Sequence, residues 1–183
     1  MTGHATLQTL EQAVDFIRQS PRDSGRIEMI VHRPAEDARA AVSTGQLDIE
    51  TGLVGDNWKI RGSKKSADGS AIPEAQITLM NSRFISVIAQ EKDRWQLAGD
   101  QLYVDLDLSE ENLPPGTRLS LGSALLEITA KPHTGCAKFS GRFGADALKF
   151  ASTKEGLAMR LRGVYAMVIQ AGTIQVGDEI RKV

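Results

Sequence analysis

The feature that most constrains this chain is a series of short apolar segments after residue 76, each about the length of one β-strand. They cover residues 77–80, 101–106, 117–121, 125–129, 164–169 and 179–183. The turns between them contain Gly99-Asp100, Pro114-Pro115-Gly116, Gly122-Ser123, Gly172 and Gly177-Asp178. Glycine and proline supply the backbone angles that tight connections require. Short strands with frequent turns predict a mainly β fold, either a barrel or a sandwich.

Helical patterns lie before and between these segments. Apolar residues recur at helical spacing over residues 7–17, with Thr6 as the expected N-cap and Pro21 as the stop. Two shorter helices are predicted over residues 82–90 and 145–150, and a further strand over residues 25–32. The order of segments shows no βαβ alternation. We therefore expect a mainly β fold with flanking helices.

Length and composition exclude several classes of protein. A chain of 183 residues is long enough to bury the core of an ordinary domain. Its single cysteine, Cys136, excludes an intramolecular disulfide and a four-cysteine zinc site. A net charge of -1 argues against nucleic-acid binding. The sequence shows neither a basic leader nor a long apolar run, so we expect a cytoplasmic protein with no membrane partner.

Basic residues are concentrated around Cys136. Residues 131–162 contain seven lysines and arginines against two acidic residues, whereas the remainder contains 15 basic and 21 acidic residues. Nearby cations stabilise the thiolate, which is the reactive form of cysteine. Pro132 and Gly135 predict a turn before the thiol, and turns commonly expose functional side chains. His133 and Lys138 are expected near the sulfur.

Three alternatives for Cys136 stay open at this point. The thiol is a small buried hydrophobe in many proteins. A cysteine hydrolase would pair it with a histidine, although no local hydrolase motif accompanies it. A zinc site would need distant ligands, since the sequence contains neither HExxH nor CxxC.

Other residues also allow two interpretations of their role. Arg142, Arg160 and Arg162 suit a phosphate group, because a guanidinium binds two oxygens at once, but they equally suit a solvated basic face. Trp58 either lines a cleft or belongs to the core or its rim. The recurring Gly-Asp pairs are expected at strand-end turns, where aspartate bonds a neighbouring amide. Residues 61–70 are expected to form a mobile surface loop.

Several blocks of sequence resemble a known family. In chain order they are Gly52-Leu53-Val54-Gly55-Asp56, Gly99-Asp100-Gln101-Leu102, residues 119–129, Cys136, Arg162-Gly163-Val164-Tyr165-Ala166, Gly172 and Gly177-Asp178. This order is similar to that of MOSC domains, named for the C-terminal domain of molybdenum cofactor sulfurase. One departure is Gln101, where the family often has asparagine. The chain resembles a small, stand-alone, bacterial-type member.

The resemblance implies a fold, a cofactor and site residues. It implies a MOSC-type β-barrel over residues 46–183, with residues 1–45 as a helix and strand extension packed on it. It also implies binding of the molybdenum cofactor (molybdopterin form), with Cys136 as metal ligand and catalytic residue in members that reduce N-hydroxylated compounds. The candidates for holding the cofactor and its phosphate are His133, Lys138, Arg142, Arg160, Arg162 and Trp58.

The resemblance leaves the reaction and the partners open. The chain has no room for a flavin or iron-sulfur domain, so a small molybdenum-dependent reductase would take electrons from a donor protein. The alternative is a sulfur carrier, in which a pyridoxal-phosphate-dependent cysteine desulfurase supplies a persulfide to Cys136. A third possibility is non-catalytic storage or handover of the cofactor.

Overall fold

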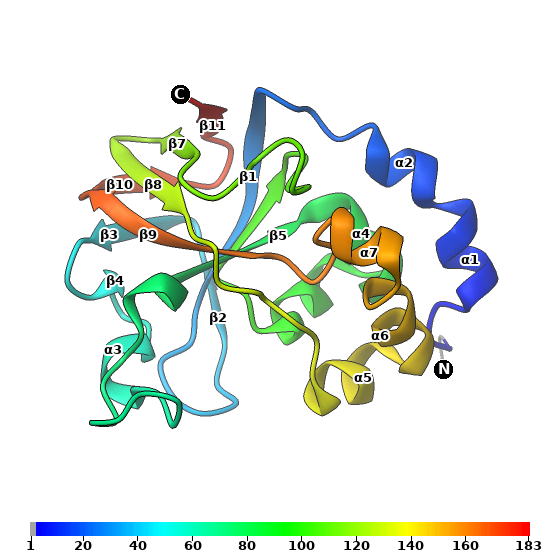
Figure 1. Ribbon diagram of the computed structural model, residues 1–183, viewed down its shortest axis with the longest axis horizontal. Helices are drawn as coiled ribbons and strands as arrows, with labels where there is room; N and C mark the ends of the chain where they lie inside the picture. Colours follow the sequence, from blue (N-terminus) through cyan, green and yellow to red (C-terminus); the bar gives the residue numbers. More distant parts are fainter. Residues whose placement is uncertain (1–2) are drawn as a thin grey trace.

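The computed structural model describes residues 3–183, and at its centre seven strands form a closed mixed β-barrel (Figure 1). The strands follow one another around the barrel in the order β11-β7-β8-β9-β5-β6-β1, and pairing of β1 with β11 closes it. Their bounds are β1 Ser24–His32, β5 Ile77–Asn81, β6 Leu102–Asp105, β7 Arg118–Leu121, β8 Ala124–Ile128, β9 Val164–Gln170 and β11 Glu179–Lys182. The prediction of a β-barrel is confirmed.

Alternating side chains fill the barrel. In β8 and β9, buried residues alternate with half-buried ones, as expected when one face of a strand points inward. The inward positions include Leu126, Ile128, Ala166 and Val168, all nearly or fully buried in a single apolar cluster. The interior is therefore a packed core, and any ligand site must lie outside it.

One pair of neighbouring strands runs parallel, which the sequence analysis did not anticipate. β5 pairs with β6 in parallel, Leu79 lying opposite Leu102. The connection passes through helix α4 (Ser82–Ala89) and the 3₁₀-helix η2 (Lys92–Ala98). This is a single βαβ unit in a barrel whose other strand pairs are antiparallel. A single crossover leaves no repeated rhythm in the sequence, which is why the pattern was missed.

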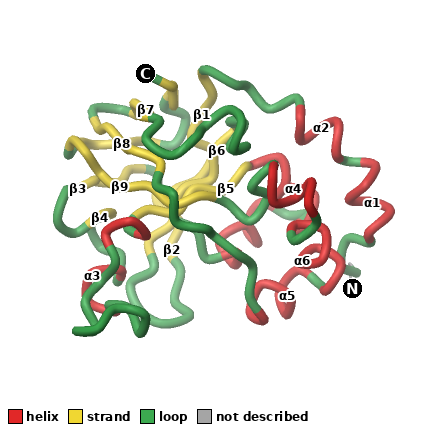
Figure 2. The backbone as a smooth tube through the Cα atoms, viewed as in Figure 1, coloured by secondary structure: helices red, strands yellow, loops and turns green. Residues whose placement is uncertain are grey.

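Helices cover one side of the barrel (Figure 2). They are α1 (Leu7–Gln12), α2 (Val14–Arg18), α4, α5 (Ala137–Phe143), α6 (Ala145–Ala151) and α7 (Lys154–Ala158). A second apolar cluster, which contains Phe84, Phe139 and Phe143, fills the space between them and the barrel. Thr6 is the predicted N-cap, but the expected helix over residues 7–17 breaks at Ala13. No helix within residues 3–183 is both long and apolar enough to cross a membrane.

The remaining elements lie at the other side of the barrel, around α3 (Trp58–Arg61) (Figure 1). Strand β2 (Ala40–Val42) pairs with β1, and β10 (Gly172–Gln175), β3 (Thr44–Asp48) and β4 (Gly52–Leu53) form a small second sheet. A 3₁₀-turn, η1 (Pro73–Ala75), precedes β5. Strand β1 is thus part of the barrel itself, although it lies within the predicted extension of residues 1–45. Its pairing on both edges, with β6 and with β11, explains this position.

Candidate functional site

Cys136 lies at the mouth of a cleft beside the barrel. It follows the loop after β8, immediately before α5, and its side chain is exposed. The cleft has a volume of about 530 Å³. Its walls come from α3 and the loop after it, from the segment Lys131 to Cys136, and from Arg33, Thr78, Gly99, Arg162 and Tyr165. Exposure excludes the alternative in which Cys136 is a buried hydrophobe.

Gly135 fits the chain closely against the helices just before the cysteine. A Cβ atom at this position would lie 2.3 Å from Cδ1 of Leu148 on α6. A glycine therefore allows the loop to pass over α6 before α5 begins. This local packing sets where Cys136 emerges at the surface.

Four cationic side chains of the cleft lack an acidic partner. Arg61, Lys64, Lys65 and Lys131 all contribute to its walls. Within residues 3–183, none of the four has a carboxylate within 4.0 Å. Cations grouped without partners create a positive potential that attracts anions. The cleft is therefore suited to a ligand with phosphate or another anionic group.

Two further arginines of the cleft are held in place by buried aspartates. Arg33 donates from Nε and Nη2 to the two carboxylate oxygens of Asp56, both at 2.8 Å, and from Nη1 to the carbonyl of Gly99 at 3.1 Å. Asp56 also accepts the backbone N–H of Trp58 at 3.0 Å. This bidentate pair fixes the start of α3 against the end of β1.

The second pair involves Asp100, which is fully buried. Its Oδ2 accepts a hydrogen bond of 2.6 Å from Nη1 of Arg162, whose Nη2 donates to the carbonyl of Ala98 at 3.0 Å. Nε2 of His133 lies 3.2 Å from Oδ1 of Asp100, although this contact lacks good hydrogen-bond alignment. The His133 ring stacks on Tyr165, with centroids 4.4 Å apart. Asp100 thus brings a histidine and an arginine together in the wall of the cleft.

Burial and charge set the protonation of this cluster. Burial alone would raise the pKa of the Asp100 carboxyl, but Arg162 and His133 outweigh it and hold that pKa below its usual value. Burial, reinforced by the charge of Arg162, lowers the pKa of His133. At neutral pH the cluster therefore holds a carboxylate, a guanidinium and a neutral imidazole.

The Gly-Asp pairs serve two different purposes. Asp178 accepts the N–H of Gln175 at 2.8 Å, as expected for a strand-end turn. Asp56 and Asp100 do more, because each holds an arginine of the cleft. Gly99 has φ = 86°, a left-handed conformation that favours glycine, and it turns the chain so that Asp100 enters the interior.

The predicted site residues fall into three groups. Cys136, His133, Arg162 and Trp58 line the same cleft, and Trp58 is also largely buried, at 4% exposed. Lys138 and Arg142 do not line it. They make ion pairs with Asp37, at 3.0 Å and 3.1 Å, because the loop after β1 brings acidic residues onto α5. Arg160 lines a separate cavity.

Several cleft residues were missed by the sequence analysis. Arg33 stands in an unremarkable segment after β1, and no local pattern marks it. Arg61, Lys64 and Lys65 lie in the stretch that was interpreted as a mobile loop. The sequence does carry a signal, because three cations occur among glycine and serine within five residues, but the same polar composition also predicts a flexible loop.

Comparisons with known proteins agree with the barrel. The chain resembles the crystal structure of the YUAD protein from Bacillus subtilis with a TM-score of 0.64 and 16% identity, over 86% of this chain and 94% of that one. It resembles YiiM from Escherichia coli with a TM-score of 0.55 and 19% identity, over 86% and 69% of the two chains. YiiM from Geobacillus stearothermophilus gives 0.57 and 16%, over 87% and 75%. These identities support the fold alone.

Sequence comparison supplies the family. No curated protein matches the chain significantly. The family model described as "MOSC domain" matches residues 68–181, which is more than half of the chain and includes every barrel strand except β1 and the last residue of β11, the loop with Cys136 and helices α4 to α7. The chain therefore belongs to the MOSC domain family.

Proposed function

We propose that the cleft binds the molybdenum cofactor, with Cys136 as the thiolate ligand of the metal, and that the protein is a small oxidoreductase acting on N-hydroxylated compounds. The main support is one juxtaposition. The only cysteine of the chain is exposed in a cleft that also contains four cations without acidic partners. Thiolate is a soft ligand that suits molybdenum, and grouped cations suit the phosphate of the cofactor.

The residues present fit such a cofactor. Arg61, Lys64, Lys65 and Lys131 would hold the phosphate, while Trp58 and His133 would form part of the wall against the pterin. Arg33 and Arg162 are committed to Asp56 and Asp100, so they would shape the wall and leave the phosphate to the other four. Six cations with two buried carboxylates leave the cleft positive overall. This balance matches an anionic ligand.

In this proposal the cofactor supplies a metal that accepts and donates electron pairs. Cys136 would hold the metal, and its exposure would let a substrate approach it. The net reaction converts R–NHOH, two electrons and two protons into R–NH₂ and water. The N–O bond breaks, and a donor protein supplies the two electrons.

A sulfur-carrier role is the second candidate, and the exposure of Cys136 favours it. A persulfide on this thiol could be reached by a pyridoxal-phosphate-dependent cysteine desulfurase and by an acceptor. A third candidate is storage or handover of the cofactor, in which the cleft binds the cofactor but catalyses no reaction. Each version locates the protein in the cytoplasm, where lone thiols remain reduced.

The proposal is tested by preparing the protein from cells that make the cofactor. Molybdenum and pterin are measured in the wild type, Cys136→Ala and Cys136→Ser. We expect one pterin per chain in the wild type, and loss of molybdenum from both variants. A full complement of metal in Cys136→Ala would refute the ligand role.

The same preparation separates the candidate activities. Reduction of a hydroxylamine with an artificial electron donor would support the reductase, provided that Cys136→Ala abolishes it. A mass increase of one sulfur atom on Cys136, without pterin, would support the carrier instead. Bound cofactor with neither result would leave storage or handover as the function.

A further inference from the structure

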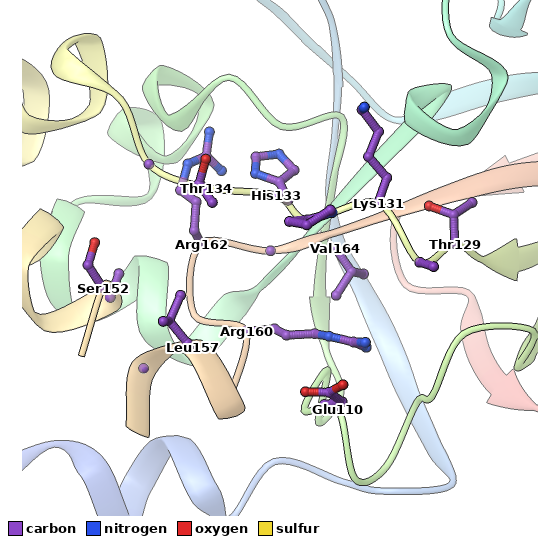
Figure 3. Close-up of a pocket in the computed structure, with 16 residues that line it drawn as sticks. Glu110, Thr129, Lys131, His133, Thr134, Ser152, Leu157, Arg160, Arg162 and Val164 are labelled. Atoms are coloured by element: carbon purple, nitrogen blue, oxygen red, sulfur yellow. The ribbon is translucent and has the colours of Figure 1, made fainter. Parts of the chain in front are cut away.

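A second cavity lies behind the segment that leads to Cys136 (Figure 3). It has a volume of about 250 Å³ and is enclosed by residues 129–135, by α7 and the residues before it, and by residues 160–164. Lys131, His133, Thr134 and Arg162 line both this cavity and the cleft, whereas Cys136 lines only the cleft. The two spaces are therefore neighbours with a shared wall.

The cavity is predominantly positive. Lys131, Arg160 and Arg162 line it against a single acidic residue, Glu110. Figure 3 shows Arg160 and Glu110 toward one end, with His133 and Arg162 toward the other. Among the described residues, Arg160 has no carboxylate within 4.0 Å, Glu110 included. Burial lowers the pKa of Arg160, an effect that Glu110 partly opposes, as expected for an incompletely compensated charge.

The Arg160 guanidinium is held in place with one edge free. Its Nη1 donates to the carbonyl of Leu113 at 2.7 Å, while Nε and Nη2 make no hydrogen bond to residues 3–183. These two nitrogens form the edge that commonly binds a carboxylate through two parallel hydrogen bonds. A fixed guanidinium loses less freedom on binding than a mobile one.

The backbone of Arg160 is also unusual. Its φ is 49°, in the left-handed region that residues with a side chain rarely adopt. Such conformations persist where the surroundings impose them, and they occur often in ligand-binding sites. Here the N–H of Arg160 donates to the carbonyl of Leu157 at 3.0 Å and its carbonyl accepts from Gly163 at 2.8 Å. Both bonds hold the residue in this conformation at the edge of the cavity.

Unpaired polar atoms occur in the shared wall. The His133 side chain is only 6% exposed, and its Nδ1 has no hydrogen-bond partner among the described residues. Nε of Arg162 is buried and unpaired as well. Buried polar atoms without partners are uncommon in folded proteins. These unpaired atoms make the shared wall polar.

Apolar side chains also line the cavity, Leu157, Val164 and Ala151 among them, beside the hydroxyl groups of Thr129, Thr134 and Ser152. We infer that this cavity binds a small organic carboxylate, with the carboxylate on the free edge of Arg160 and the apolar part of the molecule against Leu157 and Val164. This site is separate from the cofactor cleft, and its occupant would contact His133 and Arg162 from the opposite side of the wall.

The test uses the full chain without cofactor and benzoate as the probe, with inorganic phosphate as a second anion. Binding is followed by amide chemical shifts in two-dimensional NMR. We expect saturable binding of benzoate with a dissociation constant of about a millimolar, since the ligand is small. The shifted signals should come from residues 156–164 and 131–135, and phosphate should bind more weakly.

Two variants alter the cavity in different ways, one through its charge and one through its volume. Arg160→Gln removes the charge and should weaken benzoate binding about tenfold or more. Leu157→Trp fills the cavity from its rim, where Leu157 is 54% exposed, and should abolish binding while leaving the charges intact. Arg118→Gln is the matched control, because Arg118 pairs with Glu127 on β8 and lines neither space.

The result of this test does not depend on whether the proposed function is correct. Cys136→Ala should bind benzoate like the wild type, because the thiol does not line the cavity. Absence of saturable binding, or equal affinity in Leu157→Trp and the wild type, would overturn the inference. Tighter binding of phosphate than of benzoate would overturn the choice of a carboxylate.

Discussion

Asp100 and Arg162 form a buried ion pair in which Oδ2 of the carboxylate lies 2.6 Å from Nη1 of the guanidinium. The two residues are distant in sequence, since one precedes β6 and the other precedes β9. The guanidinium also lies over the ring of Phe139 on α5, 5.0 Å from its centroid. The pair therefore joins the barrel to the helix that begins beside Cys136.

Replacing Asp100 should destabilise the protein strongly. Asp100→Asn leaves Arg162 buried without its counter-charge, and breaking a buried pair in this way costs about 3 kcal/mol or more. The measurement is the free energy of unfolding in urea. Glu127→Gln is the control, because Glu127 and Arg118 form a partly exposed pair worth less than about 1 kcal/mol. Equal losses in the two variants would contradict the structural role of Asp100.

Stability should fall as the pH drops below the ordinary histidine pKa of 6.5. Burial lowers the pKa of His133 in the folded state, so the unfolded chain takes up this proton first and acid favours unfolding. The loss ends once the pH is below the lowered pKa. Asp100 adds a separate loss only below the usual aspartate value of 3.8, because its pKa is also lowered.

His133→Gln isolates the histidine contribution. Urea unfolding is compared between about pH 7.5 and pH 5, where the slope of stability against pH reports protons taken up on unfolding. We expect a flatter slope in His133→Gln than in the wild type. Identical slopes would show that His133 does not titrate differently in the folded state, which a ring titration by NMR would check directly.

Gly163→Ala should destabilise the protein far more than Gly116→Ala. Both have left-handed φ angles, of 112° and 89°, but a Cβ at Gly163 would lie 2.4 Å from the carbonyl oxygen of Leu79. At Gly116 the same atom meets nothing within 4 Å. Gly116→Ala should cost about 1–2 kcal/mol from backbone conformation alone. Gly163→Ala should cost clearly more, because the backbone of β5 cannot move aside, and thermal unfolding measures the difference.

The exposed lysines of the cleft should control cofactor retention. The double variant Lys64→Gln/Lys65→Gln removes two unpaired charges, and we expect about tenfold weaker binding of the cofactor phosphate. The readout is pterin content after gel filtration at low and high salt, since screening weakens such contacts in the wild type. Lys154→Gln, on α7 outside the cleft, should retain the wild-type content. Unchanged retention in the double variant would place the phosphate elsewhere.

The strands were predictable because their apolar segments are short and their turns are marked by glycine and proline. β7, β8 and β9 appear within one or two residues of their predicted bounds. β2, β4 and β10 were missed, because each has only two to four residues and too little pattern to detect. Helix α5 was missed for a different reason. Gly141 interrupts its pattern, and packing of Phe139 and Phe143 in the second apolar cluster stabilises it.

Four of the residues singled out in the sequence, Trp58, His133, Cys136 and Arg162, line the cleft, and only two of them are close in sequence. Cys136 and His133 lie three residues apart, and both line the cleft. Lys138 and Arg142 shared the same basic segment, yet the helix turns them toward Asp37. Positive charge in sequence did not reveal which cations would be neutralised, because their acidic partners come from the loop after β1. Those long-range contacts depend on how the barrel closes.

That closure has a consequence for how the protein is made. The first barrel strand finds one of its two neighbours only in β11, where Ser24 lies opposite Arg181. During synthesis β1 leaves the ribosome long before β11. The backbone hydrogen bonds between these two strands can therefore form only after residue 179 has been added. Contacts so distant in sequence form slowly, and open strand edges invite aggregation in the meantime. The barrel is therefore completed only after β11 has been translated.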